Sequence, residues 1–177
     1  MFLLVSCGVL KSYQKEYYLV MAYYKPARIP RVPTYHLRKP KIFISFNYTY
    51  DQGYRYLMSA WNTNPYFDFT YDDRTPCEIQ TDSVSRVKAV LTTKIKESSA
   101  VVVIIGSHAN ELHSDRHLIG YRNWQNYEIA KAKELGKRLV AVQANRNFHY
   151  PQELIGVNAT RVYSFSQNSI IKAVRGF

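Results

Sequence analysis

A tryptophan and a glutamate spaced four residues apart are the clearest candidates for chemistry in this chain. Trp124 and Glu128 lie in the segment NWQNYEIAKAKELGK, where helical spacing places both on one face with Tyr127 beside them. A carboxyl group flanked by two aromatic rings is partly removed from water, which raises its pKa and suits it to catalytic work. The same spacing also fits a simpler arrangement, in which Trp124 and Tyr127 belong to the core and Glu128 is a surface residue.

Other side chains that could do chemistry lack the partners they would need. His113 and His117 are four residues apart, but no third histidine or carboxylate has a matching spacing, so we expect no metal site. Ser107 and His108 are adjacent and lack the G-x-S-x-G turn of a nucleophile elbow, which argues against a nucleophile–base pair. No glycine-rich phosphate motif is present, so we expect neither a tightly held dinucleotide cofactor nor an NTPase.

The apolar pattern predicts an α/β scaffold for these residues. Segments 100–106 (AVVVIIG) and 138–142 (RLVAV) are apolar without alternation, which is typical of strands buried on both faces of a parallel sheet. The other expected elements are strands over 41–46, 66–71 and 160–165, and helices over 51–61, 83–98, 123–135 and 168–174. Strands that alternate with helices predict a doubly wound parallel sheet of about five strands.

Helical spacing also predicts which side chains face the core. The expected buried faces are Tyr54, Leu57, Met58 and Trp61 on the first helix, and Val84, Val87, Leu91 and Ile95 on the second. We expect residues 107–122 to form a long polar loop.

Strand order predicts where a ligand would bind. In the order 2-1-3-4-5, the winding reverses between the first and third strands, and ligands of open α/β sheets bind beyond the carboxyl ends of the strands at that point. The residues there are Phe46, Asn47 and Tyr48 after the first strand, and Gly106, Ser107 and His108 after the third.

Three segments, taken in order, resemble one known family. They are 41–48 (KIFISFNY), the strand AVVVIIGS, and the helix from Trp124 to Glu128 that leads into RLVAV. Together they resemble TIR-like domains, and among these the TIR-like subunit of the bacterial Thoeris anti-phage defence system. The resemblance implies a flavodoxin-like fold with strand order 2-1-3-4-5 for a domain over residues 41–177.

The resemblance also implies an activity. Enzymatic members of the family cleave the nicotinamide–ribose bond of NAD, and their essential glutamate corresponds to Glu128, four residues after Trp124. NAD would then be the substrate, with no bound cofactor, and the product would be a cyclic or conjugated ADP-ribose that activates a partner effector. Self-association through TIR-like surfaces is expected as well. The alternative is a non-catalytic TIR-like module that acts as a signalling scaffold.

The chemistry of NAD cleavage suggests which residues would bind the substrate. Nicotinamide leaves without an acid, so one carboxylate that stabilises an oxocarbenium-like ribose is sufficient. Phe46, Tyr48 and Trp124 offer rings for stacking, and Arg122 lies near the start of the Glu128 helix, where phosphates are favoured. The expected substrate-binding set is Phe46, Asn47, Tyr48, Ser107, Arg122 and Trp124.

The charge distribution separates the first forty residues from the rest. The chain has 177 residues with 24 Lys and Arg against 13 Asp and Glu, a net charge of +11. Seven of these basic residues and one acid lie in residues 1–40, together with four prolines. We therefore expect a basic N-terminal extension, either partly disordered or the result of a start assigned to Met1 where Met21 is the actual one. Despite its charge, the chain has no helix-turn-helix, RRM or zinc signature, so nucleic acid is not expected as a partner.

The sequence also predicts a cellular compartment. No apolar run reaches the ~18 residues of a transmembrane helix, and the first ten residues lack the charged segment of a signal peptide. Cys7 and Cys77 are too few for a disulfide framework. We therefore expect a cytoplasmic protein.

Overall fold

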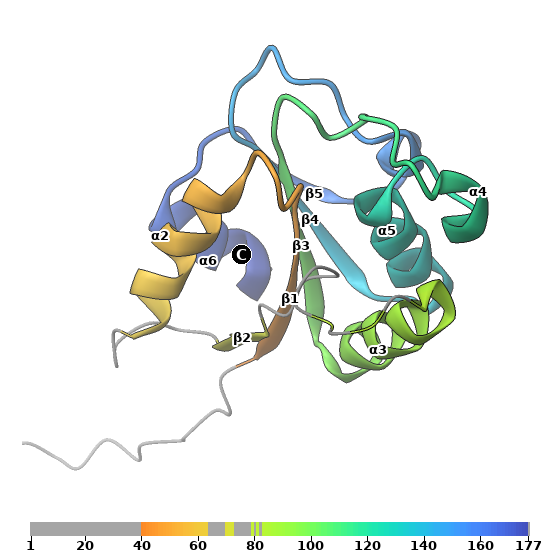
Figure 1. The fold of residues 1–177 in the computed structure, drawn as a ribbon. Helices are drawn as coiled ribbons and strands as arrows, with labels where there is room; N and C mark the ends of the chain where they lie inside the picture. The colour runs from red at the N-terminus through yellow and green to blue at the C-terminus, as the bar shows by residue number, and fades with distance from the viewer. Residues whose placement is uncertain (1–39, 64–69, 73–78, 80, 82, 177) are drawn as a thin grey trace, which may run out of the picture. The chain divides into compact units, whose positions relative to one another are not determined.

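A computed structural model describes residues 40–63, 70–72, 79, 81 and 83–176. Its strands form one parallel sheet in the order β2-β1-β3-β4-β5 (Figure 1). The strands are β1 (Lys41–Ser45), β2 (Thr70–Asp72), β3 (Ala100–Ile105), β4 (Arg138–Gln143) and β5 (Thr160–Val162). The predicted α/β class and strand order are therefore confirmed.

The helices cover the sheet in two layers (Figure 1). Helices α2 (Gln52–Asn62) and α6 (Gln167–Arg175) pack on one face. On the other face lie α3 (Val84–Glu97), α4 (Arg116–Ile119), α5 (Trp124–Glu134) and the short 3-10 helix η2 (Gln152–Leu154). None of the described helices is long and apolar enough to cross a membrane.

Strand alternation divides the core between these layers. Ile42 and Ile44 of β1 point toward the α2/α6 layer, whereas Phe43 points toward the α3/α5 layer. All six residues of β3 are buried, as expected of a strand with a helix layer on each face. Burial of each large apolar side chain contributes roughly 1.5–3 kcal/mol, so this central strand anchors both layers.

The helix that precedes β3 buries the predicted face. Val87, Leu91 and Ile95 of α3 are buried, and Val84 packs against the same cluster. On α2, in contrast, Leu57 is 50% exposed, so its predicted place in the core is wrong. Met58 alone is fully buried on that helix. The part of α2 that packs against the sheet is therefore narrower than the row of apolar residues in the sequence.

Other differences concern the ends of elements. The predicted loop 107–122 contains the short helix α4, and the last strand ends at Val162, before the predicted limit of 165. The strand predicted over 66–71 is observed as Thr70–Asp72, and residues 66–69 lie outside the described part. The predicted extension, residues 1–40, also lies outside it, apart from Pro40.

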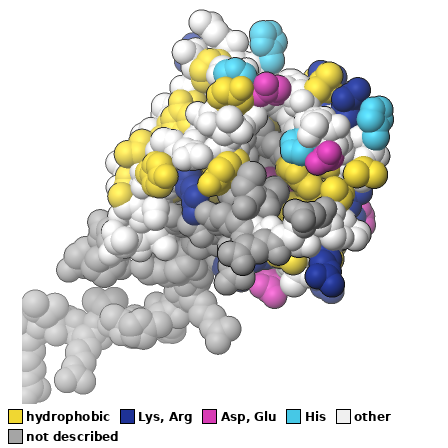
Figure 2. Space-filling view, in the orientation of Figure 1, with side chains coloured by type: hydrophobic (Ala, Val, Ile, Leu, Met, Phe, Trp, Pro, Cys, Tyr) yellow, Lys and Arg dark blue, Asp and Glu magenta, His cyan; other side chains and the backbone are white. Residues whose placement is uncertain are grey.

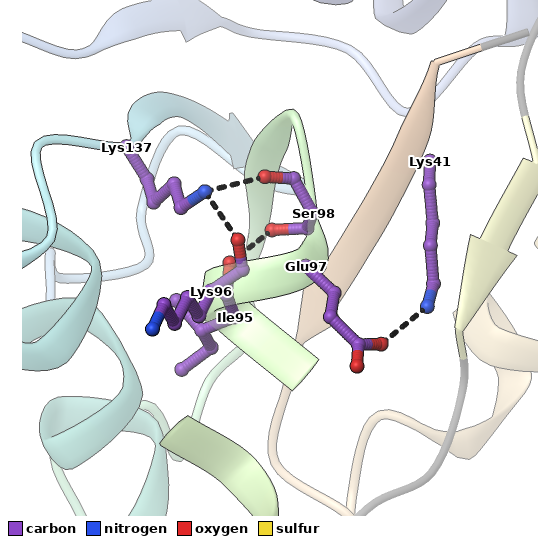
Figure 3. Close-up of polar contacts among 6 residues, drawn as sticks. All are labelled: Lys41, Ile95, Lys96, Glu97, Ser98 and Lys137. Atoms are coloured by element: carbon purple, nitrogen blue, oxygen red, sulfur yellow. Dashed lines mark hydrogen bonds and ion pairs between the residues drawn. The ribbon is translucent and has the colours of Figure 1, made fainter. Parts of the chain in front are cut away.

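At the amino edge of the sheet, side chains tie the turn between α3 and β3 to its neighbours (Figure 3). Lys137 Nζ donates to the carbonyl oxygens of Lys96 and Ser98 at 2.6 and 2.8 Å. Lys41 pairs with Glu97 at 2.9 Å. These contacts hold the edge opposite to the one where the strands end and ligands are expected.

Candidate functional site

The loops that follow β1 and β3 meet at the carboxyl edge of the sheet. Asn47 Nδ2 donates to the carbonyl oxygen of His108 at 3.2 Å. The Tyr50 ring stacks on the His108 imidazole with centroids 3.6 Å apart. The predicted meeting of segments 46–48 and 106–108 is therefore confirmed, at the point where the winding reverses.

A buried carboxylate closes this junction. Asp51 is 3% exposed, and its carboxylate accepts a hydrogen bond from the backbone N–H of Asn47 at 3.3 Å. Burial raises the pKa of Asp51, whereas the Asn47 N–H and the charge of His108 oppose that rise. A Cβ added at Gly106 would overlap the Asp51 carboxylate, so this buried side chain would have to shift if the glycine were replaced. Asp51 precedes α2 as predicted, but its side chain makes no capping hydrogen bond.

The helix that carries Glu128 begins at a well-defined cap. Asn123 Oδ1 accepts a hydrogen bond from the backbone N–H of Asn126 at 2.9 Å, which satisfies one of the free donors at the start of α5. Its Nδ2 donates to the carbonyl oxygens of Ala109 and Glu111 at 3.0 and 2.8 Å. The loop after β3 thus fixes where α5 starts.

Glu128 points into the protein and toward the sheet. Its side chain is 3% exposed, and Ser45 Oγ at the end of β1 donates to Glu128 Oε2 at 2.6 Å. Burial raises the pKa of Glu128 from 4.5 to about 8, and the Ser45 hydrogen bond acts against that rise. The alternative in which Glu128 is a surface residue is wrong, because the side chain is buried.

The aromatic residues beside Glu128 have other partners. The Tyr127 hydroxyl lies 2.9 Å from Thr92 Oγ1 and donates to the Lys88 carbonyl at 3.2 Å, so this ring points toward α3. Trp124 is partly buried and meets Tyr127 edge to face at 5.8 Å. The hydrogen-bond partner of Glu128 thus comes from β1, which the helix spacing alone does not indicate.

One further side chain of α5 binds the ends of both central strands. Gln125 is 2% exposed, and its Nε2 donates to the carbonyl oxygens of Ile104 at 2.7 Å and Ser45 at 3.4 Å. Gln125 Oε1 is buried without a hydrogen-bond partner in the described part of the chain. The sequence analysis missed Ser45 and Gln125. Ser45 could have been noticed as the single hydroxyl within the apolar run 42–46.

Two of the predicted substrate-binding residues lie away from Glu128. Phe46 is buried in the α2/α6 layer, and Tyr48 packs against that same layer. Because successive side chains of a strand point to opposite faces, Phe46 cannot share the face of its neighbour Ser45. The structure therefore does not bring Phe46 together with the Glu128 carboxyl group.

Ser107 and Arg122 line a separate open cavity of about 550 Å³. Its lining residues are Ser107, His108, Asn110, Glu111, Arg122, His149, Tyr150, Gln152 and Ile155. Figure 2 shows histidine side chains gathered on the upper and right parts of the molecular face. Arg122 Nε donates to the Asn110 carbonyl at 3.3 Å, which holds this cation at the rim. Glu128 does not line the cavity.

Of the two histidines considered for metal binding, His113 has other contacts. His113 Nδ1 lies 3.9 Å from an Asp115 carboxylate oxygen, and its ring meets Trp124 edge to face. His117 lies on α4. In the described ranges, no group of three or more His, Cys, Asp or Glu side chains is placed to hold a metal.

Comparison with known proteins gives one family match. A family model described as Thoeris protein ThsB, TIR-like domain, matches residues 43–148. One similar solved structure is a 3-dehydroquinate dehydratase-like protein from Bifidobacterium longum, with 13% identity, 77% of this chain and 96% of that chain covered, and a TM-score of 0.39. Another is the TIR domains of the activated Roq1 resistosome that recognises the pathogen effector XopQ. The identity is 19%, the match covers 58% of this chain and 56% of that chain, and the TM-score is 0.35. A search of curated proteins finds no match.

Proposed function

Because the chain belongs to the family of the TIR-like domain of Thoeris protein ThsB, we propose that it is an enzyme that cleaves the nicotinamide–ribose bond of NAD. The observation that carries this proposal is the carboxyl group of Glu128. It is buried at the carboxyl edge of the sheet, with a raised pKa and a hydroxyl donor 2.6 Å away. Strongly perturbed carboxyl groups at such an edge mark candidate functional sites.

The proposed reaction needs the ionised form of Glu128. The positively charged nicotinamide ring leaves the ribose as neutral nicotinamide. The ribose is then left as an oxocarbenium-like cation, which a nearby carboxylate stabilises. Burial favours the neutral acid, while the Ser45 O–H stabilises the anion. A cationic nicotinamide ring beside Glu128 would lower its pKa again, so the arriving substrate itself favours the catalytic form.

Access to Glu128 is part of the proposal. With 3% of its side chain exposed, the carboxyl group must be uncovered before a ribose can reach it. We place Trp124 and Asn47 near the substrate, and Ser107 and Arg122 at its phosphates. Phe46 is left out because it faces the other helix layer.

The product of the proposed reaction would act as a signal. Attack by a ribose hydroxyl or by a second molecule on the ribosyl centre would give a cyclic or conjugated ADP-ribose, and attack by water would give free ADP-ribose. We propose that the first kind of product activates a partner effector in anti-phage defence. The proposal also includes self-association through TIR-like surfaces and a cytoplasmic location.

The test is nicotinamide release from NAD by the purified full-length chain, followed by chromatography. Activity should disappear in Glu128→Gln and persist in Glu134→Gln, which removes a carboxylate on the same helix whose side chain is 64% exposed. The accompanying ADP-ribose species would identify the acceptor. Intact NAD after incubation with the wild-type chain, alone and in phage-infected cell lysate, would favour the scaffold instead.

A further inference from the structure

We propose that this chain has a second ligand site, which binds the phosphate groups of a phosphorylated small molecule. The site is an open cavity of about 450 Å³ beside β5 and the start of α6, called the basic cavity below. Its lining residues are Arg146, Thr160, Arg161, Val162, Tyr163, Ser164, Ser169, Lys172 and Ala173. This inference does not depend on the proposed NAD cleavage.

Among the described residues, nothing compensates the charge of the basic cavity. Arg146, Arg161 and Lys172 line it, and its lining contains no Asp or Glu. Over the residues that the structure describes, no ion pair involves any of these three cations. Three cations around one concave surface repel one another, and a bound dianion would relieve that repulsion.

Both arginines are supported by aromatic rings. The Arg146 guanidinium lies over the Tyr163 ring, 5.9 Å from its centroid, and the Arg161 guanidinium lies 5.1 Å from the centroid of Tyr150. Such contacts restrict side chains that would otherwise move freely. An arginine held in this way can offer two parallel N–H donors to a phosphate, which a hydrated lysine on a flexible surface does not.

Two hydroxyl groups, those of Ser164 and Ser169, complete the lining where α6 begins. Their oxygens lie 3.3 Å apart, and Ser169 Oγ accepts a hydrogen bond from the hydroxyl of Ser166, the cap of α6, at 2.8 Å. Hydroxyls can rotate their protons toward phosphate oxygens. The cavity therefore combines charge with neutral donors, and its concave shape suits a small molecule rather than an extended polymer.

The basic cavity is separate from the Glu128 region. It lies beside β5, at the end of the sheet order opposite to β2, whereas Glu128 is bonded to β1. Strands β3 and β4 lie between β1 and β5. A molecule bound in the basic cavity would thus leave the Glu128 carboxyl group free.

The experiment is isothermal titration calorimetry of the full-length chain with inorganic pyrophosphate, and in parallel with ADP. We expect saturable binding of one pyrophosphate per chain that weakens as salt is raised. Arg161→Gln and Lys172→Gln should each weaken it about tenfold or more, since each removes a charged donor. Backbone amide NMR shifts of Ser164, Ser166 and Ser169 should move on titration.

Two matched controls make the result decisive. Lys96→Gln and Arg86→Gln each remove one charge from the exposed surface of α3, outside both proposed sites. Neither should change the affinity by more than about twofold. Absence of saturable binding, equal weakening by Lys96→Gln, or loss of binding in Arg122→Gln alone would each overturn the proposal. Tighter binding of ADP than of pyrophosphate that Arg161→Gln weakens and Arg122→Gln leaves unchanged would support it and add the exposed Tyr163 ring as a contact.

Discussion

Replacement of Glu128 by glutamine should stabilise the protein, and the gain should grow with pH. In the folded state, burial raises the pKa of this carboxyl group from 4.5 to about 8. Between these two values the folded chain keeps a proton that the unfolded chain releases, so stability falls as pH rises. Glutamine stays neutral throughout, and its amide oxygen can still accept the Ser45 hydrogen bond. The stability of the variant therefore should not fall with rising pH in this way.

The size of the effect follows from the two pKa values. Each pH unit between them costs about 1.4 kcal/mol, which gives up to about 5 kcal/mol at pH 8 and above. Below pH 4.5 the Glu128 carboxyl group is protonated in both the folded and the unfolded chain, so the variant and the wild type should differ little in stability there. A gain of this size is comparable with the whole stability of many small domains.

Urea unfolding followed by tryptophan fluorescence, at several pH values from 4 to 9, measures this difference. Glu111→Gln is the control, since it makes the same substitution at an exposed glutamate instead of a buried one. A Glu128→Gln gain that does not change with pH, or one that is largest at acid pH, would refute the assignment of a buried neutral acid. Loss of NAD cleavage in the stabilised variant would show that the wild type keeps Glu128 for its function, although this residue lowers the stability of the fold.

Three further predictions concern the neighbourhood of Glu128. Ser45→Ala removes the donor that stabilises the Glu128 anion, so the pKa of Glu128 should rise further and the pH profile of kcat/KM should move to higher pH. Ser45→Thr keeps a hydroxyl donor and should restore the wild-type pH profile. Gly106→Ala places a methyl group on the Asp51 carboxylate and should destabilise by roughly 1–3 kcal/mol in urea unfolding, with a smaller cost in an Asp51→Ala background. Asn123→Ala removes the cap of α5 and should lower stability by roughly 1–2 kcal/mol, measured as a lower Tm, whereas an unchanged Tm would contradict the capping role.

The fold could be predicted because its main signals are local. The apolar run at 100–106 shows a strand covered on both faces, and the regular spacing of Val87, Leu91 and Ile95 shows which side of a helix is buried. The prediction that Leu57 lies in the core was wrong because helical spacing gives the centre of an apolar stripe but not its width. The width depends on the surface against which the helix packs. The four-residue helix α4 has too few turns to leave a periodic pattern.

The site could be predicted only in part. The position of Glu128 on a helix follows from local sequence, but its burial does not, and its partner Ser45 lies 83 positions away. Only the strand order and the register of β1 beside β3 bring these two residues together. Phe46 was included because it directly follows the first strand and offers a ring for stacking, but strand alternation directs it to the opposite layer.

The hydrogen bond between Ser45 and Glu128 has a consequence for how the chain folds during synthesis. Strand β1 leaves the ribosome long before α5, and every strand pairing in this sheet is parallel and therefore non-local. The acidic group cannot enter its buried environment until β1 and β3 are already paired beneath the helix. A nascent chain thus carries Glu128 as an ordinary solvated carboxylate. Glu128 gains its buried environment only when α5 packs against the paired strands, so a chain without this packing does not yet contain the site.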